Sequence, residues 1–126
     1  MKILEYKGVN ISQEGVDVLS GVDFSLEQGE FVYLCGKVGS GKSSLLKTLY
    51  AELPIKEGEA RIFEYDLLKL KQKDRPFLRR KIGIVFQDFQ LLNDRSVSDN
   101  LEFVFRATGW KSKKEIADQI DFVLST

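Results

Sequence analysis

The hydrophobic pattern along the chain predicts strands in its first part and helices towards its end. Residues 3–9 and 18–26 alternate loosely between apolar and polar side chains, which predicts two antiparallel strands joined by a polar loop at 10–15. Two unbroken apolar runs, 31–35 and 82–86, are typical of strands covered on both faces in a parallel or mixed sheet. A further short strand is expected over 59–63.

Helices are expected from leucine and isoleucine spacing and from start and stop signals. Leucines at helical spacing predict a helix over 43–53, which Pro54 ends. Pro76 marks the first turn of a short basic helix. Ser96 begins a helix that ends near residue 107 and is closed by Gly109, and Ser112 begins a last helix running to the end of the chain.

Composition and charge narrow the classes of protein. The 126 residues are 43% hydrophobic, which is ordinary for a globular domain, and 19 basic residues balance 19 acidic ones. The zero net charge gives no field for nucleic acid, so the basic stretch at 69–81 is interpreted as a solvated helix face and no nucleic-acid partner is expected. With neither a membrane-spanning apolar run nor a signal peptide at its start, the chain is expected to be cytoplasmic.

The content of cysteine and histidine limits the chemistry further. A single cysteine, Cys35, cannot form an internal disulfide, and its place in an apolar run predicts a buried small hydrophobe rather than a reactive thiol. Histidine is absent, which excludes catalysis by histidine and histidine ligands to a metal.

The strongest chemical signal follows the apolar run at 31–35. Residues 36–43, GKVGSGKS, match the phosphate-loop pattern G-x-x-x-x-G-K-[ST] at every fixed position. Glycines let successive backbone N–H groups face one point above the start of a helix, where a phosphate can bind. Lys42 would reach the β- and γ-phosphates, and the hydroxyl of Ser43 would bind Mg²⁺. A glycine-rich turn without a ligand is the alternative.

The order of these features points to a family. Antiparallel strands, a phosphate loop with its helix, and an apolar run ending in Gln87 together resemble the ATP-binding domain of ABC transporters. Within that family, the stretches 76–88 and 91–100 are similar to the cell-division ATPases. The resemblance covers the whole chain and implies an α/β fold with a P-loop NTPase-type mixed sheet, an amino-terminal antiparallel part and the start of a helical subdomain.

The resemblance also implies domains and binding residues. Residues 1–86 would form the nucleotide-binding core, and 87–126 would hold the Q-loop and the first helices of the helical subdomain, with the rest of the domain absent. Gln87 would act with Lys42 in catalysis and with Ser43 on Mg²⁺. Many family members have an aromatic residue that stacks on adenine where this chain has Ser12 or its neighbours Ile11 and Gln13. Tyr6 lies too far back in the sequence to take that role. Val18 would cover the purine face. The ATP-binding residues are then Gly36, Lys37, Val38, Gly39, Ser40, Gly41, Lys42, Ser43, Ser44, Ser12 and Val18, with Ser44 on the α-phosphate.

The implied function is that of an ATPase subunit coupled to a membrane partner. Such subunits act as head-to-tail pairs at the inner face of the membrane, and the segment 88–100 would face the integral membrane subunit. The chain has no Leu-Ser-Gly-Gly signature and no strand ending in Asp-Glu, so little hydrolysis is expected of it alone. Two alternatives stay open: an ATPase of lipoprotein release or macrolide export, and a non-catalytic nucleotide-binding assembly module.

Overall fold

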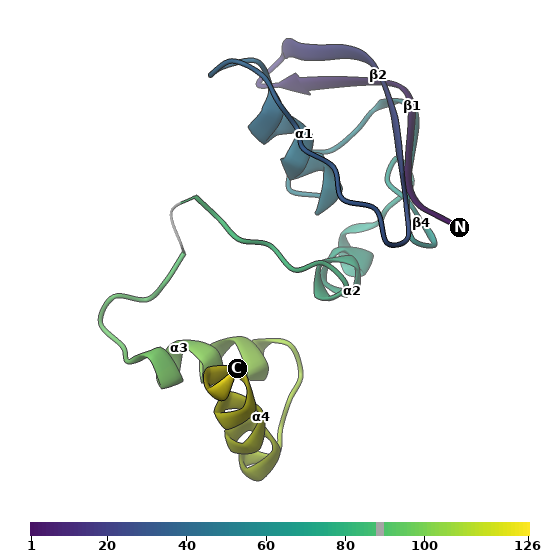
Figure 1. Cartoon of the computed structure of the whole chain (residues 1–126). Coiled ribbons are helices and arrows are strands. Elements are labelled where there is room, and N and C mark those ends of the chain that lie inside the picture. The colour runs from purple at the N-terminus through teal and green to yellow at the C-terminus, as the bar shows by residue number, and fades with distance from the viewer. Residues whose placement is uncertain (88–89) are drawn as a thin grey trace. The chain divides into compact units, whose positions relative to one another are not determined.

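The computed structural model in Figure 1 describes residues 1–87 and 90–126 of the chain. It divides the chain into two compact units, Met1–Gly83 and Ile84–Thr126. In these two stretches, no helix has the length and apolar character needed to cross a membrane.

The first unit is built on a four-stranded sheet in the order β2-β1-β3-β4, with every neighbouring pair antiparallel. The predicted strands at 3–9, 18–26 and 59–63 are confirmed, but the predicted loop at 10–15 is wrong. The first strand continues to Gln13, and the chain reverses over Glu14 and Gly15, both with positive φ, as a two-residue hairpin requires. The strand bounds are β1 (Lys2–Gln13), β2 (Val16–Glu27), β3 (Glu57–Ile62) and β4 (Tyr65–Asp66).

A bulge in β1 explains why its hydrophobic alternation is only loose. The strand has one residue more than β2 between Tyr6 and Val9 and one more than β3 between Lys7 and Asn10. Gly8, which lies in both intervals, adopts a φ of 57°. The extra residue shifts the alternation, so that Leu4 and Tyr6 before it and Val9 and Ile11 after it are all buried. The bulge thus keeps both halves of the strand directed into one core.

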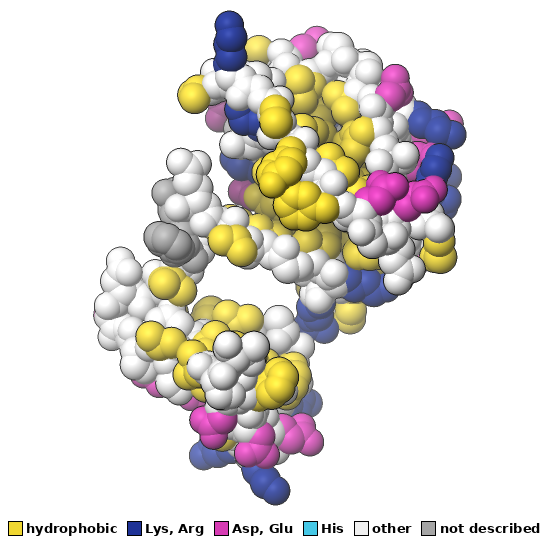
Figure 2. Space-filling view, viewed as in Figure 1, with side chains coloured by type: hydrophobic (Ala, Val, Ile, Leu, Met, Phe, Trp, Pro, Cys, Tyr) yellow, Lys and Arg dark blue, Asp and Glu magenta, His cyan; other side chains and the backbone are white. Residues whose placement is uncertain are grey.

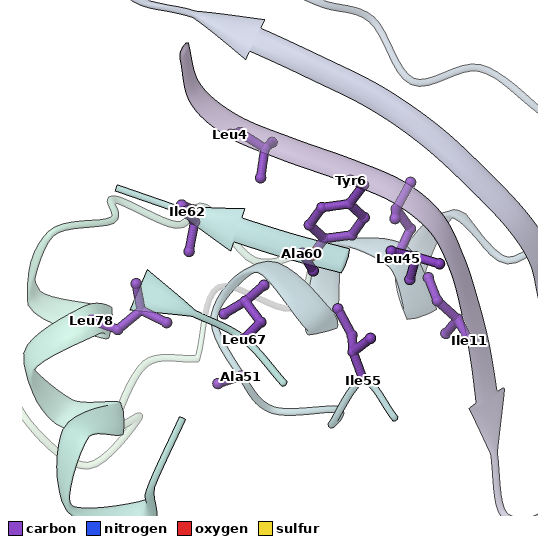
Figure 3. Close-up of a cluster of buried hydrophobic side chains, with 11 residues drawn as sticks. Leu4, Tyr6, Ile11, Leu45, Ala51, Ile55, Ala60, Ile62, Leu67 and Leu78 are labelled. Carbon is purple, nitrogen blue, oxygen red and sulfur yellow. The ribbon is translucent and has the colours of Figure 1, made fainter. Parts of the chain in front are cut away.

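Helix α1 (Lys42–Leu49) packs against β1 and forms the core with it (Figure 3). Tyr6, only 1% exposed, places its hydroxyl 2.8 Å from Oγ1 of the buried Thr48. Burial raises the pKa of Tyr6 to about 12, while the hydrogen bond to Thr48 acts in the opposite direction. The core cluster consists of Leu4, Tyr6, Val9, Ile11, Leu45, Ala51, Ile55, Ala60, Ile62, Leu67 and Leu78.

The helix after the phosphate loop ends earlier than predicted. It stops at Leu49 instead of continuing to Leu53, because Ala51 takes a left-handed φ of 61°. The carbonyls exposed at this end accept hydrogen bonds from Arg79, at 2.9 Å for Tyr50 O and 3.4 Å for Ala51 O. Arg79 belongs to α2 (Arg75–Arg80), the predicted short helix, which follows the 3₁₀ turn η1 (Gln72–Asp74) and has Pro76 in its first turn.

Neither of the two apolar runs forms a strand, so both of those predictions are wrong. Among the described residues, the four strands of the sheet pair only with one another, and a strand without a neighbour has no hydrogen-bond ladder. Phe31 and Tyr33 are 80% and 81% exposed, and Cys35 is exposed rather than buried. Hydrophobic side chains accordingly gather on the visible face of the first unit (Figure 2).

The second unit contains two helices, α3 (Val97–Ala107) and α4 (Lys113–Ser125), which contact each other. Both predicted starts are confirmed. The hydroxyl of Ser96 accepts a hydrogen bond from Asp99 N at 3.1 Å, and that of Ser112 accepts one from Glu115 N at 3.3 Å. Of the described residues in this unit, only Ile116 and Ile120 are buried.

Candidate functional site

The phosphate-loop sequence forms a turn that leads directly into α1. Ser40 N donates to Lys37 O at 3.0 Å, and Gly39 and Gly41 have φ values of 82° and 99° that favour glycine. Gly41 precedes the first residue of α1, and no side chain from the described part of the protein caps this helix at that position. Because the first N–H groups of a helix have no partner within the helix, its start can bind an anion.

Lys42 is folded back over the loop that precedes it. Its ammonium donates to Lys37 O at 3.0 Å and also to Gly36 O, so both carbonyls hold the positive charge beside the start of α1. A Cβ on Gly36 would lie 2.5 Å from the hydroxyl oxygen of Ser40, so only glycine fits the loop as it stands. The turn therefore brings an ammonium and the start of a helix together.

The β1–β2 hairpin lies against this helix start. A Cβ on Gly41 would come within 2.9 Å of the side chains of both Val18 and Leu19, so the glycine allows the strand and the loop to approach each other closely. Ser44, 8% exposed, donates its hydroxyl hydrogen to Oε1 of Gln13 at 3.0 Å. The hairpin thus contacts the loop at Gly41 through Val18 and Leu19, and contacts α1 at Ser44 through Gln13.

The structure places the other predicted residues in different environments. Val18 is half-buried against Gly41, whereas Ser12 is exposed near the end of β1 opposite Asp17. Ser43 and Val38 are exposed, and Tyr6 is a core residue. Gln87 is exposed in the second unit, and Asp88, where the predicted partner-facing segment begins, lies outside the described residues.

Asn100 of α3 makes several hydrogen bonds with the backbone in the described part of that segment. Asn100 accepts from Leu92 N at 2.8 Å and donates to Leu92 O at 3.1 Å and Ser96 O at 2.8 Å. Leu91 is 62% exposed beside it. Asn100 therefore gives the residues that precede α3 a defined conformation.

Sequence comparison identifies the family. A family model described as ABC transporter matches residues 19–126 of the chain. The chain belongs to the ABC transporter family. It is 35% identical to the cell division ATP-binding protein FtsE of Streptococcus pneumoniae serotype 2, over 98% of this chain and 55% of the relative, and 40% identical to that of Bacillus subtilis, over 86% and 49%. The chain spans about half the length of the curated relatives that it matches.

Solved structures of ABC ATP-binding cassettes share the fold. One is cbiO1 from Clostridium perfringens, part of the ABC transporter complex cbiONQ, with a TM-score of 0.81 and 29% identity over 98% of this chain and 49% of the other. Another is the cassette MJ0796, a dimer bound to ADP and Pi, with a TM-score of 0.74 and 30% identity over 90% and 52%. The predicted fold class, an α/β fold of the P-loop NTPase type with an amino-terminal antiparallel part, is confirmed, and the sheet of the described residues is wholly antiparallel rather than mixed.

Two polar contacts of the helix that follows the phosphate loop were not predicted. The first is the hydrogen bond between Gln13 and Ser44, where the sequence indicated only that Gln13 lies near the adenine position. The second is the hydrogen bonding of Arg79 to the carbonyls of Tyr50 and Ala51 at the end of α1, where the sequence predicted a solvated basic face. Neither partner pair is close in sequence, so no local pattern could have revealed them.

Proposed function

We propose that this chain is the nucleotide-binding part of an ABC-type ATPase subunit that couples ATP binding and hydrolysis to a membrane partner. The observation that carries the proposal is the phosphate loop, in which the ammonium of Lys42 lies beside the uncapped start of α1. Family membership and the ADP and Pi bound to a solved relative of the same fold support it. The FtsE relatives favour a role in cell division with an FtsX-like permease as the partner.

Different groups in and near the loop would bind different parts of the nucleotide. Backbone N–H groups from Gly36 to Ser43 would hold the phosphates, which requires Ser40 N to leave Lys37 O. Lys42 would leave its two carbonyls to reach the β- and γ-phosphates. Ser44 would contact the α-phosphate. Val18, half-buried beside Gly41, would cover the purine together with Ser12.

The donor set on the chain suits Mg²⁺ held chiefly by the nucleotide. Mg²⁺ prefers oxygen ligands, and it usually binds through a few protein groups together with phosphates and water. Ser43 offers an exposed hydroxyl at the start of α1, and Gln87 offers a carboxamide oxygen. The ion would neutralise phosphate charge, while these two side chains would orient it.

The same proposal assigns the two stretches of the chain. Residues 1–86 would bind the nucleotide, and 87–126 would pass its state from Gln87 to the membrane subunit at the inner face of the membrane. The complete protein would act as a homodimer, consistent with the dimeric form of the MJ0796 cassette. The 126-residue chain alone should hydrolyse ATP slowly, since its sequence has neither a Leu-Ser-Gly-Gly signature nor an Asp-Glu pair.

Calorimetric titration of the chain with Mg-ATP tests the site. The unsubstituted chain should release heat with a measurable Kd, and Lys42→Ala should weaken binding at least tenfold, because hydrogen bonds to a charged group are lost. Lys47→Ala, a lysine change in the last turn of the same helix, is the matched control and should bind like the unsubstituted chain. Absence of heat with the folded chain, or equal affinity of the Lys42 and Lys47 variants, would overturn the proposal.

Two further measurements separate the alternatives for the whole protein. Phosphate release that Lys42→Ala abolishes would exclude a non-catalytic assembly module. Co-purification of the full-length protein with its membrane subunit would separate a cell-division ATPase from one of lipoprotein release or macrolide export. Recovery of an export permease instead of an FtsX-like one would replace the first assignment with the second.

A further inference from the structure

Gln13 links the β1–β2 hairpin to the phosphate-loop helix. It is the last residue of β1, and Ser44 is the third residue of α1, 31 positions further along the chain. Ser44 is buried to the extent that only 8% of its surface is exposed, so its hydroxyl has few possible partners. The bond of 3.0 Å from Ser44 Oγ to Gln13 Oε1 uses the single hydrogen of that hydroxyl.

This arrangement conflicts with the role proposed for Ser44 towards a phosphate. Phosphate oxygens only accept hydrogen bonds, so Ser44 must donate to bind one. A hydroxyl that already donates to Gln13 cannot also donate to a phosphate. A carboxamide, however, has an acceptor oxygen and a donor NH₂ group that exchange places when the group turns by half a rotation.

We propose that Gln13 is a positioning residue that switches the hydrogen bond of Ser44 when a nucleotide binds. The carboxamide turns so that Nε2 donates to Ser44 Oγ, and the hydroxyl hydrogen of Ser44 then points to the phosphate. No movement of the backbone is needed, because Val18 and Leu19 already hold the hairpin against Gly41. The inference rests on the proposed function and adds a residue to its site.

The ability of the side chain at position 13 to donate and accept hydrogen bonds should therefore determine the nucleotide affinity. A glutamate of the same length would accept the hydrogen of Ser44 but has no hydrogen to give in return at neutral pH. A methionine of similar length offers only a weak acceptor and no donor, so it would leave Ser44 free but unoriented. The expected order of nucleotide affinity is glutamine, then methionine, then glutamate.

Calorimetric titration with Mg-ATP tests this order with Gln13→Met and Gln13→Glu. Gln13→Glu should weaken binding roughly tenfold or more, since a hydrogen bond to a charged group is lost, and Gln13→Met should lie between it and the unsubstituted chain. Gln28→Glu makes the same chemical change in the turn beyond the far end of β2, and it should bind like the unsubstituted chain. Thermal unfolding of each variant checks that the fold is retained.

A double-mutant cycle with Ser44→Ala separates positioning from simple charge repulsion. If Gln13 acts through Ser44, the loss caused by Gln13→Glu should be at least threefold smaller when Ser44 is alanine. Three results would each overturn this inference while leaving the proposed function intact. They are equal losses in the two backgrounds, equal affinities of the Met and Glu variants, and a Gln13→Glu variant that binds like Gln28→Glu. An unsubstituted chain that does not bind Mg-ATP would overturn the proposed function and this inference with it.

Discussion

Strand β1 and the apolar run at 31–35 each contain five hydrophobic residues but have different structures. In β1 the side chains of Tyr6, Val9 and Ile11 are at most 1% exposed, and the strand has a hydrogen-bonded neighbour on each side. In the run, Phe31 and Tyr33 are about four-fifths exposed, and the segment forms no strand. Hydrophobicity marks both stretches for burial, but a strand also requires a neighbour to receive its backbone hydrogen bonds.

The largest expected effect is on the free energy of unfolding, to which the buried side chains of β1 should contribute and the exposed side chains of the run should not. Ile11→Ala should lower the free energy of unfolding by about 2–5 kcal/mol, because it leaves a cavity in the packed core of the first unit. Val32→Ala should change it by no more than about 0.5 kcal/mol, because Val32 is 60% exposed. Urea unfolding followed by circular dichroism measures both values. Similar losses for the two variants would mean that the run at 31–35 is buried in solution.

A second prediction contrasts the tyrosines of the two stretches at high pH. Burial raises the pKa of Tyr6 from 10.0 to about 12, so the folded chain favours the neutral phenol. Its contribution is fully present below pH 10 and is lost as the pH rises from 10 to 12, by about 3 kcal/mol in total. Tyr6→Phe should therefore remove part of the alkaline loss of stability, whereas Tyr33→Phe, at an exposed position, should leave it unchanged.

The measurement is the free energy of unfolding of the three chains between pH 8 and pH 12. At pH 8 the Tyr6→Phe variant should be about 1 kcal/mol less stable, since the hydrogen bond to Thr48 is lost. Parallel pH profiles for the Tyr6 variant and the unsubstituted chain would contradict the burial of this phenol.

Substitutions of the aromatic residues in the run should have the smallest effect on stability. Their effect on self-association should be larger than their effect on stability. Phe31 and Tyr33 form an exposed aromatic pair with ring centroids 5.0 Å apart, and exposed apolar patches favour self-association. Replacing both by serine should lower the sedimentation-derived association constant while changing stability by less than about 0.5 kcal/mol. Val16→Ser, at an apolar position 65% exposed in the hairpin, is the control. Unchanged association in the double variant would show that this pair does not mediate it.

The parts of the fold that depend only on residues adjacent in sequence could be predicted. The starts of α3 and α4 follow from Ser96 and Ser112, because a cap needs only the next three residues. The end of α1 could not be predicted from local sequence. Ala51 takes a left-handed φ there, and the carbonyls of Tyr50 and Ala51 just beyond the helix accept hydrogen bonds from Arg79, 29 and 28 residues away. The strands predicted at 31–35 and 82–86 failed for a similar reason, since local sequence cannot say whether a pairing strand is present.

In the candidate site too, local features could be predicted and contacts between distant residues could not. The phosphate-loop pattern predicts its residues because glycines, lysine and serine act within one short loop. The contacts of that loop with the hairpin, through Val18 to Gly41 and through Gln13 to Ser44, depend on how β1 and β2 pack on α1. The sequence placed Val18 near the nucleotide by resemblance, but the hydrogen bond that orients Ser44 became visible only in three dimensions.

The bulge at Gly8 has a consequence for how this strand tolerates changes in length. Because the extra residue is what brings Val9 and Ile11 back to the inward side, loss of Gly8 would restore ordinary alternation and leave all four inward side chains in place. Loss of any single residue between Val9 and Gln13 would instead turn the side chains on one side of the gap to the opposite face. Gly8 is thus a position where β1 can shorten by one residue without exchanging its interior for its exterior.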